Sequence, residues 1–366
     1  MDGAAHLARI GAASRATGSP GAANARAYCA EVLTRLGFDV REHVFEYSDV
    51  AGALAAPVAG GVVALAALGL YLGQIWRPAG IVTAVALVAA LAALGRLGSR
   101  GVLDFPLRRR RGVNLEAVRG AREPAVWLVA HVDSKWQPVS MIARVCGVVA
   151  SAIGLASLML LDVAPSVEGR AVGAALVLAT WLAALPLMMS FVGSRNQGTL
   201  DNASGVAAVL AAAQRLPASA RVGVLITDAE ELALAGARAW VRSRALGNSA
   251  PAVALNCDSV DDDGQLVLMY TRRAPKGLIA RMNAAASDLG EPLRVLRLIP
   301  GILTDSVALA DAGWETLTLS RGTARTLQRI HTRRDTLEHM RGAGIGGAAA
   351  VLARVAGEVG GDRQED

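Results

Sequence analysis

The sequence predicts an α/β protein with a mostly parallel central sheet flanked by helices, into which four transmembrane helices are inserted as two hairpins. Two observations predict this fold class. Short apolar runs alternate with segments of helical apolar spacing along most of the chain, as in proteins with a parallel sheet. Four much longer stretches contain no charged residue and approach the length that crosses a bilayer.

The composition excludes several classes of protein. The chain has 366 residues, of which 53% are hydrophobic and 19% are charged. A soluble domain usually has about 25% charged residues, and the mean hydropathy here is +0.39. The chain is therefore not disordered, and part of it is expected to lie in lipid. Its three cysteines, Cys29, Cys146 and Cys257, include no C-x-x-C pair, so neither a disulfide framework nor a cysteine-based zinc site is expected.

The α/β elements follow one another in a regular order. Residues 20–37 have helical spacing, Gly37 is placed to end that helix, and residues 39–47 are expected to be extended. The first fifteen residues have no apolar core, so no cleavable signal peptide is expected. Strands are predicted at 113–118, 125–130, 222–227, 252–257, 265–270 and 316–320. Helices are predicted near 204–215, 235–245, 276–288 and 341–358.

The uncharged stretches predict two helical hairpins in the membrane. They run from 50 to 76, 78 to 95, 145 to 161 and 171 to 194. Short polar segments join the first two at 77–78 and the last two at 162–170. Backbone groups in lipid must bond within their own segment, which favours helices. The alternative is a set of buried core helices in a soluble protein, but four such segments arranged in pairs would be unusual.

Positive charge predicts the orientation of these hairpins. Most of the basic residues near the hairpins fall on one side: Arg41, Arg96, Arg100, Arg108 to Arg111, Lys135, Arg144 and Arg195. That side, with the rest of the chain, is expected to be cytoplasmic. The run from Arg108 to Arg111 could instead bind nucleic acid, but its position beside an apolar stretch favours a membrane-facing role, and no nucleic-acid partner is expected.

The first chemically informative residues end the strand predicted at 125–130. His131 and Asp133 lie on the same side of an extended chain, so Asp133 can orient the imidazole of His131. This spacing alone is a weak signal, because a histidine at a strand end is more often a surface residue.

Two further segments carry carboxylates near predicted strand or helix ends. Asp201 lies in the segment 198–205, before an apolar helix, where Asp201 or Ser204 could simply cap that helix. Glu230 and Glu231 follow the strand at 222–227, and adjacent carboxylates there are costly unless a cation or a proton compensates. One of the two could bind a metal while the other addresses a water molecule. The alternative is a solvated acidic turn.

Asp258 follows the strand at 252–257, and His331 occurs late in the chain. The other histidines, His6, His43 and His339, lack such a context and are expected at the surface. Ligands in open α/β sheets bind at the carboxyl ends of the strands, which is where these side chains fall. Nitrogen and oxygen donors without sulfur suit zinc, and two metal ions that share a carboxylate suit hydrolysis.

Five motifs in order resemble those of a known family. The motifs are H-V-D-S, G-T-L-D-N-A-S-G, A-E-E-L-A-L-A-G-A, N-C-D and H-T-R-R-D-T. They are similar to those of zinc-dependent exopeptidases of the aminopeptidase Y and bacterial leucyl aminopeptidase type, peptidase family M28, to which glutaminyl cyclases are related. The resemblance covers most of the chain outside the apolar hairpins. It implies the zinc-exopeptidase variety of the α/β fold, with a phosphorylase/hydrolase-like sheet.

The resemblance also implies a site with two zinc ions. His131 and Asp258 would hold one ion, Glu231 and His331 the other, and Asp201 would bridge them. Glu230 would be the general base, and Asp133 the partner of His131. Asp305, Asn202 and Asp335 would support the site.

The expected protein is a multi-pass membrane peptidase with its catalytic domain in the cytoplasm. It would remove N-terminal residues from a peptide or a small aminoacyl substrate, and its oligomeric state is left open. The peptidase domain would comprise 1–49, 99–141 and 195–360, the hairpins 50–98 and 142–194, and a disordered tail 361–366. The alternatives are a glutaminyl cyclase-like acyltransferase, an inactive membrane receptor or scaffold, and a transporter. Transport is disfavoured because the four segments lack ionisable residues.

Overall fold

The computed structural model describes the chain except for residues 1, 121–122, 164–166, 248–250, 299–301 and 362–366. The chain divides into two compact units. The first comprises the described residues of Met1–Tyr47, Arg110–Trp136 and Gly193–Asp366, and the second comprises Ser48–Arg109 and Gln137–Val192. The sequence of the first unit is thus interrupted twice by the second.

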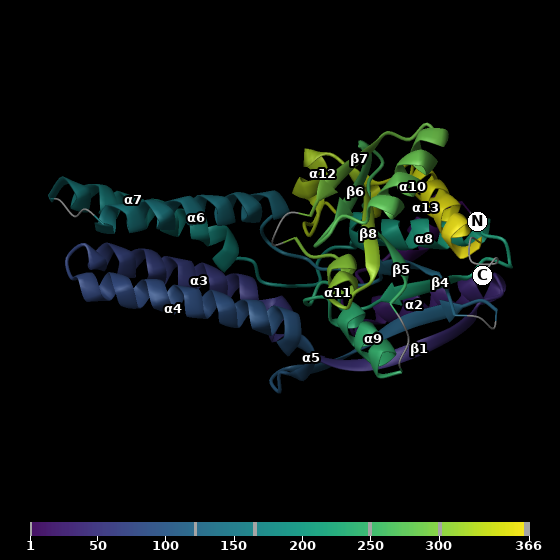
Figure 1. Cartoon of the computed structure of the whole chain (residues 1–366), viewed down its shortest axis with the longest axis horizontal. Coiled ribbons are helices and arrows are strands. Elements are labelled where there is room, and N and C mark those ends of the chain that lie inside the picture. Colours follow the sequence, from purple (N-terminus) through teal and green to yellow (C-terminus); the bar gives the residue numbers. More distant parts are fainter. Residues whose placement is uncertain (1, 121–122, 164–166, 248–250, 299–301, 362–366) are drawn as a thin grey trace. The chain divides into compact units, whose positions relative to one another are not determined.

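The first unit is built on an eight-stranded sheet (Figure 1) with the order β1-β2-β4-β3-β5-β8-β6-β7. The strands are β1 (Asp39–Ser48), β2 (Arg109–Val118), β3 (Val126–His131), β4 (Val222–Thr227), β5 (Val253–Val260), β6 (Gln265–Tyr270), β7 (Leu293–Arg297) and β8 (Glu315–Gly322). The four central strands β4, β3, β5 and β8 are parallel to one another. Toward the edges, β2 is antiparallel to β4 and β6 is antiparallel to β8. The mostly parallel sheet expected from the sequence is therefore confirmed.

Helices cover both faces of this sheet. Helices α8 and α13 contact the central strands on one face, and α1 packs on α8. Helices α9 and α11 cover the other face, where Trp240 and Leu309 join Trp127 and Val129 of β3 in one buried apolar cluster. The helices of this unit are α1 (Gly3–Ile10), α2 (Pro20–Arg35), α8 (Ser204–Arg215), α9 (Ala235–Leu246), α10 (Lys276–Asp288), α11 (Asp305–Asp311), α12 (Ala324–Arg329) and α13 (Ile345–Gly361), with short helical turns η2 (Thr199–Ala203) and η3 (Leu337–His339).

Most elements of the first unit lie where the sequence predicts them. The helix expected at 341–358 begins later, at Ile345, and Gly37 follows α2 with the positive φ of 81° that glycine tolerates. Elements that the sequence does not predict are α1, β7, α11 and α12. Three of them are helices of eight residues or fewer. The fourth, β7, has the sequence LRVLR, in which the two arginines obscure the pattern of a strand.

The expectation that His6 is a surface residue is wrong. His6 is completely buried in α1. The amide of Gln214 donates a hydrogen bond to His6 Nε2 at 2.9 Å, and His6 Nδ1 lies 2.7 Å from the hydroxyl of Tyr28. A histidine with both ring nitrogens paired can be buried without losing hydrogen bonds, and the partners come from α8 and α2, which the local sequence does not reveal.

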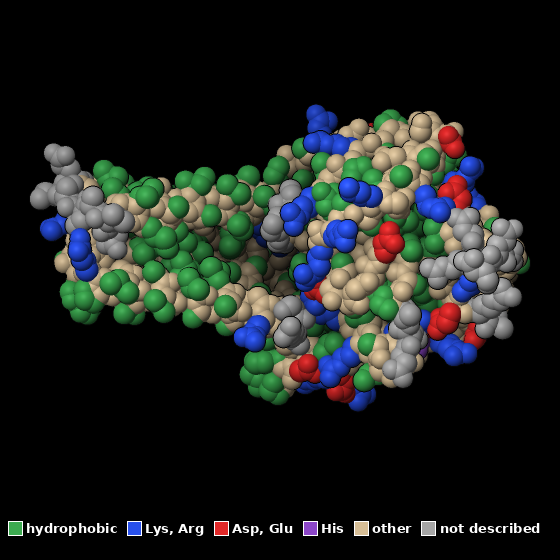
Figure 2. Space-filling view, in the orientation of Figure 1, with side chains coloured by type: hydrophobic (Ala, Val, Ile, Leu, Met, Phe, Trp, Pro, Cys, Tyr) green, Lys and Arg blue, Asp and Glu red, His purple; other side chains and the backbone are tan. Residues whose placement is uncertain are grey.

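The second unit consists mainly of four long apolar helices in two hairpins (Figure 1). These are α3 (Val50–Gly73), α4 (Arg77–Arg96), α6 (Met141–Val163) and α7 (Val167–Met188), with the short turns η1 (Leu97–Gly101) and α5 (Val102–Asp104) after α4. All four are long and apolar enough to cross a membrane. Only 11% to 28% of the apolar stretch of each helix is buried, and Figure 2 shows apolar side chains along their surface.

Small residues let these helices approach closely. A Cβ added to Gly60 of α3 would lie 2.7 Å from the backbone of Met188, and one added to Gly154 of α6 would lie 2.1 Å from the hydroxyl of Thr180. The Thr180 hydroxyl donates to Leu176 within its own helix at 2.7 Å. Helices packed through small residues, with polar groups satisfied internally, are typical of membrane bundles.

Candidate metal centre

The candidate ligands meet at the carboxyl edge of the parallel strands. His131 is the last residue of β3, and Asp258 lies near the end of β5. The remaining candidates come from loops beside that edge, after β4, in η2 and after α12: Glu230, Glu231, Asp201 and His331. All six side chains are buried.

Sharp turns present several of these side chains to the site. Ala229, just before the paired glutamates, and Ser259, just after Asp258, have positive φ angles of 57° and 60°. His331 itself has a φ of 64°. Backbone of this kind is uncommon for residues other than glycine and is concentrated at functional sites.

Asp201 lies between the two histidines. Its Oδ1 is 3.2 Å from His131 Nε2, and its Oδ2 is 3.1 Å from His331 Nε2. Glu231 Oε1 lies 2.8 Å from His331 Nε2, while Asp258 Oδ1 lies 3.8 Å from His131 Nε2. The two oxygens of one carboxylate therefore face two separate histidines, each with a further carboxylate beside it.

Two groups of potential metal ligands result. One is His131, Glu230 and Asp258, and the other is Asp201, Glu231 and His331; within each group the ligand atoms lie within 4.8 Å of one another. Glu231 Oε1 is buried and accepts no hydrogen bond among the described residues. A buried carboxylate oxygen without a donor is costly, and a cation between Glu231, His331 and Asp201 would satisfy it. The nitrogen and oxygen donors present therefore fit a pair of zinc-like ions.

Burial and neighbouring charged groups strongly shift the pKa values of the carboxylates in the centre. Burial opposes ionisation of Asp201, but hydrogen bonds with His131 and His331 outweigh it and lower its pKa. Glu231 likewise has a pKa lowered to about 2, because His331 and Lys135 outweigh the effect of burial. Glu230 has a pKa raised well above its usual value, first by burial and then by Glu231 and other nearby carboxylates. Neighbouring carboxylates with opposite shifts suit different chemical roles.

Comparison with known proteins decides the family. The sequence profile of peptidase family M28 matches residues 114–356, which is more than half of the chain. The chain belongs to peptidase family M28. This M28 member is therefore a peptidase, a hydrolase of peptide bonds. A search of curated protein sequences found no match.

Solved structures share the fold of this M28 peptidase. An aminopeptidase from Aneurinibacillus sp. strain AM-1 is 13% identical with a TM-score of 0.57, over 98% of this chain and 93% of that one. The zinc aminopeptidase BSAP from Bacillus subtilis is 14% identical with a TM-score of 0.55, over 96% and 93%. A glutaminyl cyclase from Fimbriiglobus ruber is 14% identical with a TM-score of 0.57, over 97% and 93%. At these identities the likeness establishes the fold.

Asp133 contacts the centre in two ways. Its backbone carbonyl lies 3.1 Å from His131 Nδ1, and its carboxylate Oδ1 is 3.5 Å from the same nitrogen. The two carboxylate oxygens accept hydrogen bonds from the backbone N–H groups of Glu230 and Glu231, both at 3.1 Å. The sequence predicts an orienting role toward His131 alone. In the M28 peptidase the Asp133 carboxylate also fixes the turn that carries both glutamates.

Asp133→Asn is expected to lower metal affinity or activity by about 10- to 100-fold, the usual effect of removing a group that orients metal ligands. In this variant an NH2 group replaces one of the two carboxylate oxygens of Asp133. The backbone N–H of either Glu230 or Glu231 then loses its acceptor and faces another donor. Metal content and hydrolysis rate of the purified variant measure this effect. Asp288→Asn, at an exposed residue of α10, is the matched control, and equal activity in the two variants would contradict the role.

Asp335 and Asn202, two of the predicted supporting residues, form hydrogen bonds with backbone groups near the centre. Asp335 accepts hydrogen bonds from the N–H groups of Leu200 at 2.6 Å and Asp201 at 3.2 Å. Asn202 accepts from Ser259 N–H at 3.0 Å and donates to the carbonyl of Cys257 at 3.0 Å, which ties the Asp201 loop to the end of β5.

Asp305 is the last of the predicted supporting residues. It is buried, burial raises its pKa to about 7, and its carboxylate accepts a hydrogen bond from the Thr227 hydroxyl at 2.5 Å. This contact joins the start of α11 to the end of β4, beside the paired glutamates. The structure thus brings all ten predicted site residues into one region.

Arg15 is a supporting residue that the sequence does not reveal. It is completely buried, and its guanidinium donates hydrogen bonds to backbone carbonyls. These include Val132 at 2.8 Å, beside His131, and Gln197 and Gly198 at 2.5 and 2.7 Å, before Asp201. Burial lowers its pKa to about 10, against the opposing effect of nearby carboxylates. Arg15 therefore fastens together the two loops that carry His131 and Asp201.

Arg15→Met is expected to lower the free energy of unfolding by about 3–5 kcal/mol, because several buried carbonyls would lose their donors. For a unit of this size the change corresponds to a fall in Tm of about 6–10 °C. Thermal unfolding of the detergent-solubilised protein measures it. Arg294→Met, on the exposed side of β7, should leave Tm unchanged; an equally unchanged Tm for Arg15→Met would contradict the structural role.

Lys135 is a second residue whose place the sequence does not predict. The sequence suggests a charge beside the membrane, but the Lys135 side chain is only 12% exposed and its Nζ lies 2.5 Å from Glu231 Oε2. The sequence does set this residue apart, because Lys135 and Lys276 are the only lysines in a chain otherwise rich in arginine.

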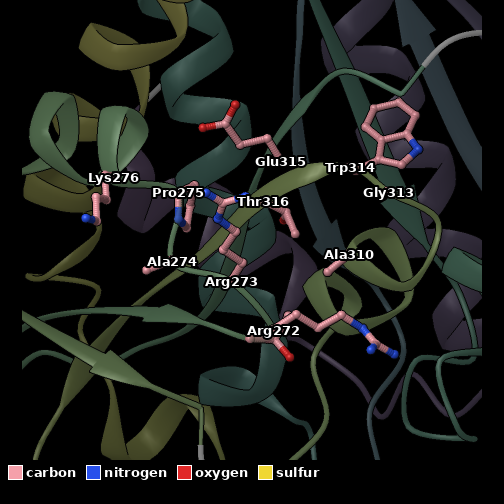
Figure 3. Close-up of a pocket in the computed structure, with 11 residues that line it drawn as sticks. Arg272, Arg273, Ala274, Pro275, Lys276, Ala310, Gly313, Trp314, Glu315 and Thr316 are labelled. Atoms are coloured by element: carbon pink, nitrogen blue, oxygen red, sulfur yellow. The ribbon is translucent and has the colours of Figure 1, made fainter.

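One cavity of the described chain lies away from this centre. It has a volume of about 640 Å³ and is lined by the β6–α10 and α11–β8 connections, including Arg273, Lys276 and Thr316 (Figure 3). Thr316 is the second residue of β8, so the cavity lies at the amino ends of the parallel strands, opposite the carboxyl ends that carry the ligands. Among its lining residues Glu315 is the only carboxylate and none is histidine.

Proposed function

We propose that this M28 peptidase is a membrane-anchored aminopeptidase with two zinc ions. The observation that carries the proposal is the position of Asp201, whose two oxygens each face a different histidine at 3.2 and 3.1 Å. His131 and Asp258 would hold one ion, Glu231 and His331 the other, and Asp201 would bridge them. The zinc aminopeptidase from Bacillus subtilis, which has the same fold, supports the identity of the metal.

In this mechanism the chain's own groups move the proton. Bound zinc supplies a Lewis acid that lowers the pKa of water towards about 7 and polarises the scissile carbonyl. Glu230 accepts the proton of the attacking water and delivers it to the leaving amine. Its carboxylate is suited to hold a proton, because burial and the adjacent carboxylates raise its pKa. Asp133 keeps Glu230 in place through the backbone N–H.

The substrate is proposed to be a peptide or small aminoacyl compound with a free α-amine. Two of the similar solved structures are named as aminopeptidases, which supports removal of N-terminal residues. Glutaminyl cyclase-like acyl transfer is the second candidate, because the Fimbriiglobus ruber enzyme matches the fold equally well, with a TM-score of 0.57. The presence of both ligand groups favours hydrolysis over it and over an inactive receptor or scaffold.

A panel of aminoacyl-anilides and N-terminal glutaminyl peptides separates these functions. The purified full chain in detergent is expected to release the anilide from free aminoacyl substrates and to leave N-acetylated ones intact. Cyclisation of glutaminyl peptides without anilide release would support the cyclase instead. No turnover of any substrate by protein with confirmed bound zinc would favour the inactive scaffold.

We further propose that α3, α4, α6 and α7 are two transmembrane hairpins inserted into the peptidase domain at 50–98 and 142–194, with the catalytic domain in the cytoplasm. The support is the length and apolar surface of the four helices and the clustering of arginines on one side of them in the sequence. Fusions of the C-terminus to green fluorescent protein and to alkaline phosphatase test the orientation. A fluorescent fusion with an inactive phosphatase is expected, and the reverse pattern would place the site outside the cytoplasm.

A further inference from the structure

Glu231 divides its two carboxylate oxygens between two different neighbours. Oε1 faces His331 Nε2 at 2.8 Å and accepts no hydrogen bond among the described residues. Oε2 lies 2.5 Å from the ammonium of Lys135. One oxygen is therefore directed at the candidate metal position, while the other is already held by a cation of the chain itself.

Lys135 is held in this position by its surroundings. The amide of Asn196 donates to the Lys135 carbonyl at 2.9 Å. The next residue, Trp136, exchanges two backbone hydrogen bonds with Gly193, at 2.9 and 2.8 Å, and its ring stacks with Arg195 and Arg333. The backbone at Lys135 is thus anchored, and from this position its side chain, only 12% exposed, reaches Glu231.

The two ligand groups differ in this respect. In the group of His131, Glu230 and Asp258, neither carboxylate has a lysine or arginine within ion-pair distance among the described residues. Arg15, the other buried cation nearby, donates its side-chain hydrogen bonds to backbone carbonyls. Within the described chain, only the group of Asp201, Glu231 and His331 therefore has a basic side chain directly on a ligand.

We propose that Lys135 governs the second metal position: it limits Glu231 to binding through one oxygen, Oε1, and makes the position of Asp201, Glu231 and His331 the weaker of the two. The physical reason is that an ammonium a few ångströms from a bound cation repels it in a poorly solvated site. In addition, the strong interaction with Lys135 occupies Oε2, which leaves Oε1 as the oxygen of Glu231 that faces the metal position. The proposal rests on the proposed function, because it requires two metal positions.

The consequence is ordered loading. The position at His131 and Asp258 fills first, and the position at Glu231 and His331 fills at higher free zinc. A lysine suits this role better than an arginine. The planar guanidinium of arginine would bind both carboxylate oxygens of Glu231, and neither oxygen would then be available to a metal ion. In a chain with only two lysines, the presence of one here is consistent with that requirement.

Zinc titration of the metal-free full chain in detergent, in competition with a chromophoric chelator, tests the proposal without any activity measurement. The wild-type protein is expected to show two dissociation constants that differ at least tenfold. Lys135→Met is expected to tighten the weaker position at least tenfold and leave the stronger one unchanged within twofold. Lys276→Met, at the only other lysine and an exposed one, should match the wild type.

Two further variants keep the outcome decisive. Lys135→Gln replaces Lys135→Met if thermal unfolding shows that the latter does not fold. Lys135→Arg keeps the charge and is expected to keep the second position weak or weaken it further. An unchanged or weakened second position in the neutral variants would overturn the role of Lys135 while leaving the two-zinc proposal intact. Binding of a single zinc ion by all variants would overturn the two-zinc function itself.

Discussion

Glu230→Gln is expected to lower kcat by a factor of about 10² to 10⁴ while the protein retains both metal ions. The glutamine side chain keeps the size and the backbone contacts of Glu230, including the hydrogen bond from its N–H to Asp133 at 3.1 Å. It cannot accept and deliver a proton. Steady-state hydrolysis of an aminoacyl-anilide, together with metal analysis of the same sample, measures both quantities.

Metal content distinguishes a general base from a ligand at Glu230. The structure groups Glu230 with His131 and Asp258, and its Oε2 lies 4.0 Å from His131 Nε2. If Glu230 were chiefly a ligand, Glu230→Gln would lose one metal ion along with activity. Glu315→Gln changes an exposed glutamate at the amino end of β8 and should behave as the wild type.

Asp201→Asn is expected to abolish measurable turnover and to reduce bound zinc to one ion or fewer per chain. Both oxygens of Asp201 face histidines, and an amide nitrogen in place of either one cannot bind a metal. The lowered pKa of Asp201 shows that its surroundings favour the charged form that a bridging ligand requires. Metal analysis after dialysis against a limiting zinc concentration measures the loss.

The same substitution at an exposed position provides the control for Asp201. Asp288→Asn on α10 should retain two zinc ions and full activity. Retention of two ions by Asp201→Asn would show that the metals are held independently and that Asp201 does not bridge them.

The sheet and the position of the site are predictable from the sequence because each depends on local patterns. The runs that form β3 and β4 are short and apolar up to their last residue, as is typical of strands buried on both faces. The carboxyl ends of parallel strands share one edge of a sheet, which is why the sequence alone places His131 and Asp258 together. β7 escapes prediction, because it has only half-buried residues between its arginines.

Residues that act through tertiary contacts are not predictable in the same way. Arg15 lies far in sequence from Gln197 and Val132, and nothing in the segment around it indicates that it is buried.

Only part of the role of Asp133 is predictable, because the rest depends on the pairing of β3 with β4. The sequence indicates that it orients His131, but its hydrogen bonds to the backbone of Glu230 and Glu231 depend on how β3 and β4 pair. The contact between Lys135 and Glu231 is not predictable either, because a count of charges beside the membrane takes no account of burial.

The most direct test of the central claim is the hydrolysis rate of metal-free full-length protein as zinc is added in defined equivalents. The account predicts that activity on a free aminoacyl-anilide rises to its maximum as the second equivalent per chain binds, and that Asp201→Asn stays inactive throughout. Full activity at one equivalent, with no further change at two, would contradict a catalytic centre in which Asp201 joins two metal ions.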